Sequence, residues 1–339
     1  MNREKILIFG PSWVGDMMMA KSLFSNLKKR NSRCIIHLAA PRWSIDIANR
    51  FPEIDKIIPL DFSHGKLDLI KRVRLSFSLR KEKYDECIFL VNTFKSLFSI
   101  LFANIKLRTG FIGEWRGLFL NNALQNNTLP TIEKFTVLSR SKNYKNPKVI
   151  TPTIKPNKIS GINFLAKRKI PFKKLVIIAG GAEYGPAKIL PQQKYANIAI
   201  KLIKKGFHIL LVGSNNDKKI NQKINELTNY ECFDITGKTS LKDCIDIFSL
   251  SIYFLSNDSG LMHIAAALKI KQESFFGSSD PNHTPPVNQN SFINYLNLEC
   301  SPCFKRECPL NHFDCMNLIN ENEVYERIIK IVKITKNQI

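Results

Sequence analysis

Acidic residues are scarce in this chain of 339 residues. It has 28 Asp and Glu against 51 Lys and Arg, which gives a formal net charge of +23. Between positions 134 and 182 there is no Asp or Glu at all. A surplus of this size predicts an anionic partner: nucleic acid, a membrane face or a phosphorylated substrate. The charge by itself does not choose among these three classes.

Long apolar runs are also missing. No stretch reaches the ~18 consecutive apolar residues that a membrane span needs, and the best candidate, 97–105, is interrupted by Ser99 and Asn104. The apolar run behind the polar first residues is too short for the core of a signal peptide. With 15 Gly and 16 Pro the chain is not linker-dominated. We therefore expect a cytoplasmic protein whose eight cysteines are reduced thiols or metal ligands.

The apolar residues that are present alternate between short strand-like runs and longer amphipathic segments. This alternation predicts an α/β fold with parallel sheets and helices on both faces. The expected strands are 5–10, 34–40, 56–60, 86–91, 109–112, 175–180, 208–213, 234–236, 252–257 and 273–277, and the expected helices are 17–29, 67–80, 95–105, 193–204, 217–227, 241–250, 261–268 and 323–333.

The length and the restart of the pattern after position 173 predict two Rossmann-like, doubly wound domains. The carboxyl ends of their strands would face a central cleft, where such folds bind ligands. The expected bounds are 1–150 for the N-terminal domain, 151–170 for a linker and domain entry, 171–320 for the C-terminal domain and 321–339 for a final helix.

The first candidate motif, GPSWVGD at 10–16, follows the first strand and opens a helix. It is similar to a dinucleotide-binding turn, but Ser12 replaces the glycine that lets the backbone approach a pyrophosphate, and no acid ends the second strand. The nicotinamide interpretation is therefore weak. Asp16 is either a helix cap or a general base that takes a proton from an attacking hydroxyl, and the motif by itself favours the cap.

Two motifs in the second half suit a phosphate group. In NDSGLMH at 257–263, Asp258 or Ser259 can cap the helix, and the N–H groups from Gly260 onward can hold a phosphate, with His263 one turn further on. In GGAEYGPAK at 180–188, a glycine-rich backbone and Lys188 suit a departing pyrophosphate. The structural alternatives are a capped helix with a core-facing histidine, and a solvated surface lysine.

Four cysteines lie close together near the C-terminus, in the order Cys300, Cys303, Cys308 and Cys315. Four thiols can bind zinc tetrahedrally, but this spacing is tighter than in the common zinc folds, so a metal site and free thiols both stay open. Among the basic residues, Lys95 follows the end of a strand and is a candidate for an anion site.

Taken together, the motifs resemble glycosyltransferase family 9, whose members have the GT-B fold. The resemblance covers nearly the whole chain and rests on GPSWVGDMMM, NTFKS, RTGFIGEWR, GGAEYGPAK, NDSGLMHIAAAL and GSSDPNHTPP. It implies an inverting enzyme that moves L-glycero-D-manno-heptose from ADP-heptose to the first heptose of the lipopolysaccharide inner core. The alternatives are transfer to another core position and a GT-B-type sugar-nucleotide epimerase.

The resemblance also implies roles for individual residues. Asp16 matches the proposed general base and Lys188 the lysine beside the diphosphate. Ile189 and Leu190 stand where the family commonly has Arg-Trp, so the contacts of that arginine do not carry over. No metal pair is apparent and no cofactor is expected. The implied donor-binding residues are Ser12, Gly15, Gly181, Ala182, Glu183, Ser214, Asp258, Ser259, Gly260 and His263, and the implied acceptor-binding residues are Lys95 and Arg116.

The basic surplus fits a phosphorylated, lipid-anchored acceptor in an anionic membrane. We therefore expect peripheral attachment at the cytoplasmic face of the inner membrane. Nucleic acid is not expected as a partner, because no recognition module is visible and it would not explain glycine-rich strand-to-helix turns in both halves.

Overall fold

A computed structural model describes residues 3–62, 67–125 and 128–336. The chain divides into two compact units, Met1–Pro152 and Thr153–Ile339, called here the N-terminal unit and the C-terminal unit. Positions 337–339 of the expected final helix lie outside the described residues. No helix in the described ranges is both long and apolar enough to cross a bilayer.

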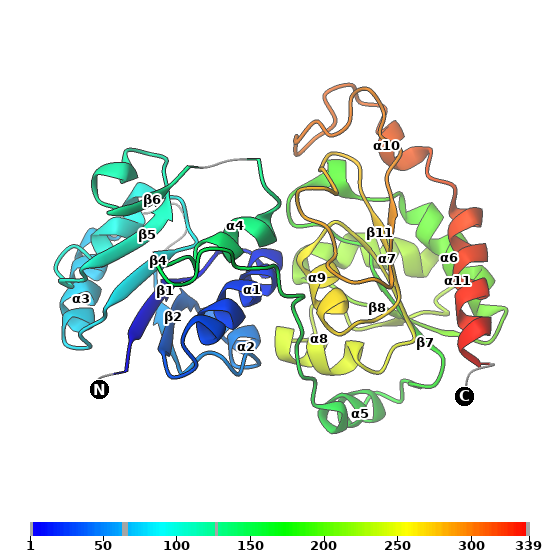
Figure 1. Cartoon of the computed structure of the whole chain (residues 1–339). Helices are drawn as coiled ribbons and strands as arrows, with labels where there is room; N and C mark the ends of the chain where they lie inside the picture. Colours follow the sequence, from blue (N-terminus) through cyan, green and yellow to red (C-terminus); the bar gives the residue numbers. More distant parts are fainter. Residues whose placement is uncertain (1–2, 63–66, 126–127, 337–339) are drawn as a thin grey trace. The chain divides into compact units, whose positions relative to one another are not determined.

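The described part of the N-terminal unit contains a six-stranded parallel sheet in the order β3-β2-β1-β4-β5-β6 (Figure 1). Its strands are β1 (Lys5–Phe9), β2 (Ile35–Pro41), β3 (Lys56–Leu60), β4 (Glu86–Phe89), β5 (Leu107–Phe111) and β6 (Asn122–Leu124). Its helices are α1 (Val14–Arg30), α2 (Ile45–Ala48), α3 (Leu69–Arg80) and α4 (Thr131–Val137), with short 3₁₀ turns η1 (Arg42–Ser44), η2 (Phe94–Ser99) and η3 (Arg116–Leu118).

Strand alternation divides the core of this unit into two layers. Leu7 and Phe9 of β1 pack with Leu79 of α3 and with residues of η2 on one face. Figure 1 shows α3 on this side of the sheet and α1, α2 and α4 on the other. The rings of Phe9 and Phe89 stack at 5.2 Å between centroids, which ties β1 to its neighbour β4.

The C-terminal unit repeats this design with the strand order β12-β11-β10-β7-β8-β9, again parallel. Its strands are β7 (Leu175–Ala179), β8 (His208–Leu211), β9 (Phe233–Asp234), β10 (Tyr253–Asn257), β11 (Gln272–Phe275) and β12 (Ser291–Asn294). Its helices are α5 (Lys158–Ala166), α6 (Gln192–Ile203), α7 (Lys218–Leu227), α8 (Leu241–Phe248), α9 (Gly260–Ala267), α10 (Asp314–Asn317) and α11 (Glu321–Lys336), with 3₁₀ turns η4 (Pro186–Lys188) and η5 (Asn215–Asp217).

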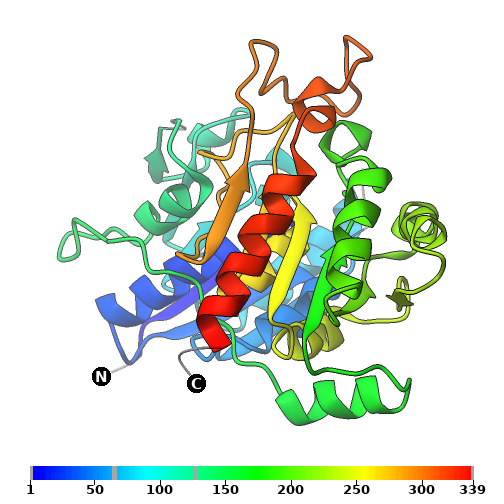
Figure 2. The same cartoon turned by 90° about the vertical axis from the view of Figure 1, so that its right-hand side faces the viewer.

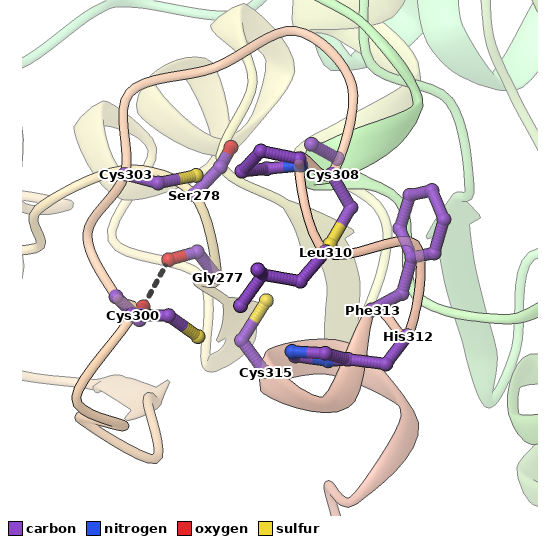
Figure 3. A pocket seen from close by; sticks show the side chains of 12 residues that line it. Gly277, Ser278, Cys300, Cys303, Cys308, Leu310, His312, Phe313 and Cys315 are labelled. Carbon is purple, nitrogen blue, oxygen red and sulfur yellow. Dashed lines mark hydrogen bonds between the residues drawn. The ribbon is translucent and has the colours of Figure 1, made fainter.

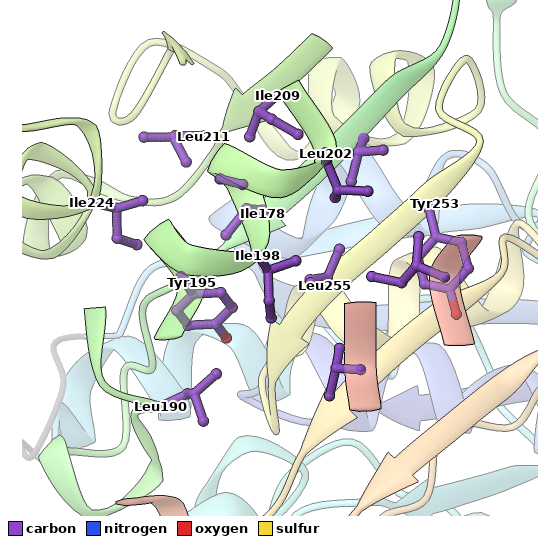
Figure 4. Close-up of a cluster of buried hydrophobic side chains, with 14 of the residues drawn as sticks. Ile178, Leu190, Tyr195, Ile198, Leu202, Ile209, Leu211, Ile224, Tyr253 and Leu255 are labelled. Atoms are coloured by element: carbon purple, nitrogen blue, oxygen red, sulfur yellow. The ribbon is translucent and has the colours of Figure 1, made fainter. Parts of the chain in front are cut away.

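One face of this second sheet is covered by α6, α7 and α11. Ile178 of β7 and Leu255 of β10 are fully buried against Ile198 and Leu202 of α6 (Figure 4). Figure 2 shows α11 lying along this layer, where Ile328 is fully buried. Each unit therefore has its own apolar core.

The prediction of two doubly wound parallel sheets is confirmed, and most predicted strands and helices begin within two or three residues of the observed ones. The strands and α-helices that were not predicted are the edge strands β6 and β12, the short helices α2, α4 and α10, and the helix α5. The predicted helix at 95–105 is wrong, since only the 3₁₀ turn η2 forms there. That segment is rich in Phe and Ser, which are weak helix formers.

Helix α5 lies inside the stretch 151–170 that we expected to be a linker and domain entry. Its sequence contains Gly161, which normally weakens a helix by ~1 kcal/mol. At this position a Cβ would lie 2.6 Å from the carbonyl oxygen of Asp246, so the glycine lets α5 pack closely on α8. The helix thus depends on a tertiary contact that no local pattern reveals.

Candidate functional site

The strand order of the C-terminal unit creates a switch point between β7 and β10. The chain continues from β7 to its neighbour β8 on one side, whereas β10 lies on the other side. Doubly wound sheets bind ligands at the carboxyl ends of strands at such a point. The glycine-rich turn at 180–188 follows β7, and Asp258 to Gly260 follow β10. The fold therefore brings together the two motifs that the sequence linked to phosphate.

Asn257, the last residue of β10, organises this edge and was missed in the sequence analysis. Its fully buried side-chain oxygen accepts hydrogen bonds from the backbone N of Leu190 at 2.9 Å and from the hydroxyl of Tyr195 at 3.0 Å. Its amide nitrogen donates to the carbonyl oxygens of Gly180 at 2.8 Å and Gly181 at 3.2 Å. Both ends of the glycine-rich turn are thus held against β10. An amide at the very end of a buried strand was the available signal.

Gly181 is required by the close approach of Asp217. A Cβ at position 181 would overlap the Asp217 carboxylate. That carboxylate accepts hydrogen bonds from the backbone N of Ser214 at 2.7 Å and from its hydroxyl at 2.8 Å, which forms the capping box at the start of η5. The predicted donor residue Ser214 therefore already donates its hydroxyl hydrogen within the protein.

The two residues that follow Gly181 are more accessible. Ala182 is half-buried and Glu183 is exposed. The carboxylate of Glu183 accepts a hydrogen bond from the side chain of Asn216 at 3.3 Å. This contact joins the loop after β7 to the turn that follows β8.

Lys188 and Asp258 form an ion pair across this edge. Only 16% of the lysine side chain and 6% of the aspartate side chain are exposed, and the lysine Nζ lies 5.0 Å from the ring centroid of Tyr184. The carboxylate of Asp258 is therefore already paired within the protein. A diphosphate bound here would compete with this carboxylate for the lysine Nζ.

The N-terminus of α9 has no side-chain cap. Ser259 occupies the N-cap position in an extended conformation, but its hydroxyl forms no cap hydrogen bond, so the prediction that Ser259 or Asp258 caps this helix is wrong. Within the described residues, the buried Oγ of Ser259 has no hydrogen-bond partner. The N–H groups from Gly260 onward and the positive end of the helix dipole therefore form an anion-binding arrangement.

His263 lies one turn into α9 and is buried. Burial lowers the pKa of its imidazole to about 4, with Asp258 opposing and Lys188 supporting this shift. The ring is therefore neutral at physiological pH. It can donate or accept a hydrogen bond at this edge, but it supplies no positive charge.

In the N-terminal unit, Asp16 is the third residue of α1 and is half-buried. The N-cap residue is Trp13, which makes no side-chain cap bond, so Asp16 lies in the first turn of the helix and not at the N-cap position itself. The carboxylate lies near the positive end of the helix dipole. Ser12 is exposed and Gly15 is buried at the same turn, which follows the carboxyl end of β1 at the β1/β4 switch point.

The two predicted acceptor residues differ in accessibility. Lys95 is half-buried in η2, after β4. The guanidinium of Arg116 is fully buried: it donates to the side-chain oxygen of Asn92 at 3.2 Å and to the carbonyl oxygen of Phe111 at 3.3 Å, and burial lowers its pKa. In this structure Arg116 holds the loops after β4 and β5 together.

The four clustered cysteines line one cavity together with His312 (Figure 3). Burial and the neighbouring thiols Cys300, Cys308 and Cys303 raise the pKa of Cys315 to about 11. Among the described residues, no group of three or more His, Cys, Asp or Glu is arranged to hold a metal ion.

The cysteine-rich segment also supports the glycine-rich turn. The carbonyl oxygen of Arg306 accepts a hydrogen bond from the backbone N of Ala187 at 3.0 Å. The carbonyl oxygen of Phe304 accepts one from the hydroxyl of Tyr184 at 2.8 Å. The segment therefore contributes to the position of the residues that precede Lys188.

Comparison with known proteins agrees with this arrangement. Residues 72–314 match the family model described as glycosyltransferase family 9 (heptosyltransferase). The chain is 36% identical over 307 residues to lipopolysaccharide heptosyltransferase 2 of Salmonella typhimurium. The alignment covers 85% of this chain and 87% of that protein. The chain belongs to glycosyltransferase family 9. It is therefore a glycosyltransferase.

A further relative and a solved structure agree with this membership. Lipopolysaccharide heptosyltransferase 2 of Escherichia coli is 34% identical over 303 residues, with 85% of this chain and 87% of that protein covered. The solved structure of the E. coli ADP-heptose lipopolysaccharide heptosyltransferase II aligns with a TM-score of 0.86 and 29% identity, over 98% of this chain and 99% of that one. The GT-B fold predicted for this family 9 enzyme is thereby confirmed.

Proposed function

We propose that this family 9 enzyme transfers L-glycero-D-manno-heptose from ADP-heptose to the first heptose of the lipopolysaccharide inner core, with inversion at the anomeric carbon. The relatives that cover 85% of the chain at 34–36% identity carry the name heptosyltransferase 2, which supports this choice of core position. Transfer to another core position and sugar-nucleotide epimerisation are the alternatives.

One observation carries the donor side of the proposal. The glycine-rich turn, Lys188 and the uncapped N-terminus of α9 lie at one switch point, at adjacent strands β7 and β10. This combination suits the diphosphate of a sugar nucleotide, because backbone N–H groups, a helix dipole and one lysine all favour negative charge. The donor-binding residues of the proposal are Ser12, Gly15, Gly181, Ala182, Glu183, Ser214, Asp258, Ser259, Gly260 and His263.

In the proposed mechanism, Asp16 removes the proton of the acceptor hydroxyl as its oxygen attacks the anomeric carbon of the donor. The bond from that carbon to the ADP oxygen breaks, and ADP departs with the electron pair. Lys188 and the first turn of α9 stabilise the negative charge that develops on the diphosphate. These groups act in the role that a metal ion fills in other transferases, and we propose no cofactor.

On the acceptor side, Lys95 contacts the phosphorylated acceptor in this proposal. Arg116 acts by positioning the loops after β4 and β5, since its guanidinium is buried. The lipid-anchored acceptor and the net charge of +23 support peripheral attachment to an anionic membrane at the cytoplasmic face. Nucleic acid is not a partner in this proposal.

The decisive experiment incubates the protein with ADP-heptose and a set of truncated core acceptors and identifies products by mass spectrometry. Addition of one heptose only to the acceptor that ends in the first heptose is the expected result. Addition to a different acceptor would replace the assigned core position. An altered donor formed without any acceptor would indicate an epimerase instead.

The Asp16→Asn variant tests the base in the same assay. Because general bases contribute typically ~10²–10⁴ in rate, we expect transfer to fall by that factor while ADP binding is retained. Equal turnover of the variant and the unsubstituted enzyme would remove Asp16 from the mechanism.

A further inference from the structure

Exposed apolar side chains are concentrated in one part of the N-terminal unit. About half of the large apolar side chains that the described residues expose lie between positions 67 and 119, which is less than a sixth of the chain. The most prominent are called here the apolar rim: Ile70, Phe77, Leu101, Phe102, Trp115 and Leu118, each 41–84% exposed. Isolated exposed apolar residues are normal, whereas a concentration of this kind marks an interaction surface.

The elements that carry the apolar rim are connected to one another. The rings of Phe77 in α3 and Phe102 after η2 stack at 4.9 Å, and the backbone N of Phe102 donates to the hydroxyl of Ser76 at 2.6 Å. From η2, the ring of Phe94 contacts that of Phe119 at 5.7 Å. Helix α3, η2 and the loop around η3 therefore present these side chains from one linked assembly.

The loop around η3 holds its apolar tip in a fixed conformation. Trp115 and Leu118 are each 84% exposed, and Trp115 has a φ of 61°, a strained conformation for a bulky residue. Between them, the side chain of Arg116 is buried and bonded to Asn92 and Phe111. The protein thus anchors a turn whose two largest side chains have little contact with the rest of the chain.

Basic residues accompany the apolar rim. Lys71, Arg74 and Arg80 are exposed on α3, and no acidic residue interrupts the sequence between Asp68 and Glu82. Glu82 is ionised, since Lys5 and Lys56 lower its pKa to about 2, but its negative charge is offset by these two lysines, which each pair with it at 2.8 Å. Exposed Trp, Leu, Ile and Phe beside Lys and Arg are the combination that binds the interface of an anionic bilayer.

We propose that the apolar rim docks this enzyme onto an anionic lipid bilayer, with Trp115 and Leu118 inserted at the acyl boundary and Lys71 and Arg74 at the headgroups. This surface deepens the proposed function, since it gives a lipid-anchored acceptor a route to Lys95 without a membrane-spanning helix. Nucleic acid fits less well, because isoleucine and leucine offer nothing to phosphates or base edges.

Tryptophan fluorescence tests the docking directly, because the chain has three tryptophans. In a Trp13→Phe/Trp43→Phe background, Trp115 is the sole emitter. Vesicles of phosphatidylcholine with one third phosphatidylglycerol should shift its emission to the blue, and brominated acyl chains should quench it. Emission that stays unchanged while the protein cosediments with the vesicles would overturn the proposal.

Cosedimentation with the same vesicles measures the contribution of each side chain. Ile70→Ser and Leu118→Ser should each lower the partition coefficient roughly tenfold, the effect of withholding one large apolar side chain from the interface. Lys71→Gln and Arg74→Gln should each lower the partition coefficient onto anionic vesicles roughly fivefold. Their partition onto vesicles of pure phosphatidylcholine should be unchanged. Tyr230→Ser and Leu318→Ser, at side chains 69% and 61% exposed in the C-terminal unit, are the matched controls and should have no effect.

A second copy of the chain is the competing occupant of the apolar rim. Sedimentation velocity without lipid should give the same species for the unsubstituted protein and for Leu118→Ser. A dimer that Leu118→Ser dissociates would assign the surface to self-association and overturn membrane docking.

Transfer assays on a soluble and on a membrane-embedded acceptor distinguish the membrane docking from the proposed transferase activity. Leu118→Ser should transfer heptose normally to a deacylated, water-soluble acceptor and several-fold more slowly to the same acceptor embedded in vesicles. If the variant and the unsubstituted enzyme transferred heptose to the embedded acceptor at equal rates, the docking proposal would be contradicted and the proposed function would stand. Failure of the unsubstituted enzyme on the soluble acceptor would contradict the proposed function, while fluorescence and cosedimentation would still decide the docking.

Discussion

At the scale of single residues, the ion pair between Lys188 and Asp258 has two effects. It holds the lysine Nζ at the switch point of the C-terminal unit, and it neutralises the charge there in the absence of donor. Both side chains are largely removed from solvent, so loss of one partner leaves the other charge unpaired. A variant at this position therefore changes stability as well as chemistry, and the two effects need separate measurements.

Lys188→Ala should lower kcat by ~10²–10³, the usual effect of removing one group that stabilises developing negative charge, and should weaken ADP binding less. It should also cost about 3 kcal/mol of stability through the unpaired Asp258. The double variant Lys188→Ala/Asp258→Asn should regain the stability but not the rate. Calorimetric ADP titration, steady-state kinetics and urea unfolding measure the three quantities. An unchanged kcat in Lys188→Ala would contradict the role in leaving-group departure.

Lys194→Ala is the matched control for this variant. Lys194 also belongs to the C-terminal unit and pairs with Glu321 at 2.8 Å. It takes no part in the proposed mechanism, so its removal should leave kcat and ADP affinity unchanged.

His263 gives a prediction for the dependence of stability on pH. Its pKa in the folded protein is about 4, below the ordinary value of 6.5, so the unfolded chain binds the proton more readily. The contribution of His263 to the free energy of unfolding is fully present above pH 6.5 and is lost as the pH falls toward 4. Between about pH 7 and pH 5 the loss amounts to about 2 kcal/mol.

Substitution His263→Gln should remove this part of the pH dependence. Urea unfolding of both proteins at the two pH values, followed by circular dichroism, measures it. A His263→Gln variant that loses as much stability on acidification as the unsubstituted protein would show that another group titrates.

At the scale of elements, the turns that follow the strands are held by contacts from distant parts of the chain. Asn257 fixes the turn after β7 from the end of β10, and Asp217 fixes it from the turn after β8. The positions of the proposed donor-binding residues in these turns therefore depend on the register of β7, β8 and β10. Local sequence predicts that a turn exists there, but these partners decide its shape.

Gly181→Ala tests this arrangement, because the added methyl group would overlap the Asp217 carboxylate. We expect the turn or η5 to shift and ADP affinity to fall at least tenfold, with the transfer rate falling in proportion. Isothermal titration calorimetry with ADP measures the loss. Gly113→Ala is the control, since no atom lies within 4 Å of a Cβ placed there. ADP affinity unaffected by Gly181→Ala would mean that the turn does not contact the nucleotide.

At the scale of the whole molecule, the two units each have a sheet with its own buried layers. Chains with separate cores commonly unfold in more than one step. The proposed donor-binding residues other than Ser12 and Gly15 belong to the C-terminal unit, so ADP should stabilise that unit in particular.

Differential scanning calorimetry should therefore show two unfolding transitions. Saturating ADP should raise the midpoint temperature of one of them. At a hundredfold excess over Kd the stabilisation is about 2.7 kcal/mol, which corresponds to a shift of roughly 5–10 °C. Ile178→Ala in the core of the C-terminal unit should lower the same transition, and Leu7→Ala should lower the other. If ADP instead raised the midpoint of the transition that Leu7→Ala lowers, donor binding in the C-terminal unit would be contradicted.

The amino-acid sequence by itself determined the class of fold and the places where a site could lie. Apolar runs of strand length, separated by helical periods and ended by Gly, Ser and Asp, are local signals that survive in any context. They located β1, β7 and β10 and the turns that follow them. The family resemblance rested on these same turns.

Only the tertiary structure decided which partners the site residues have. Asp258 pairs with Lys188, 70 positions away, and Asn257 bonds to residues at similar separations. Arg116 is buried although its sequence neighbours are exposed, and α5 forms on a glycine that contacts α8. Such contacts arise between segments distant in sequence, and their energies depend on burial and geometry that exist only once both sheets have formed.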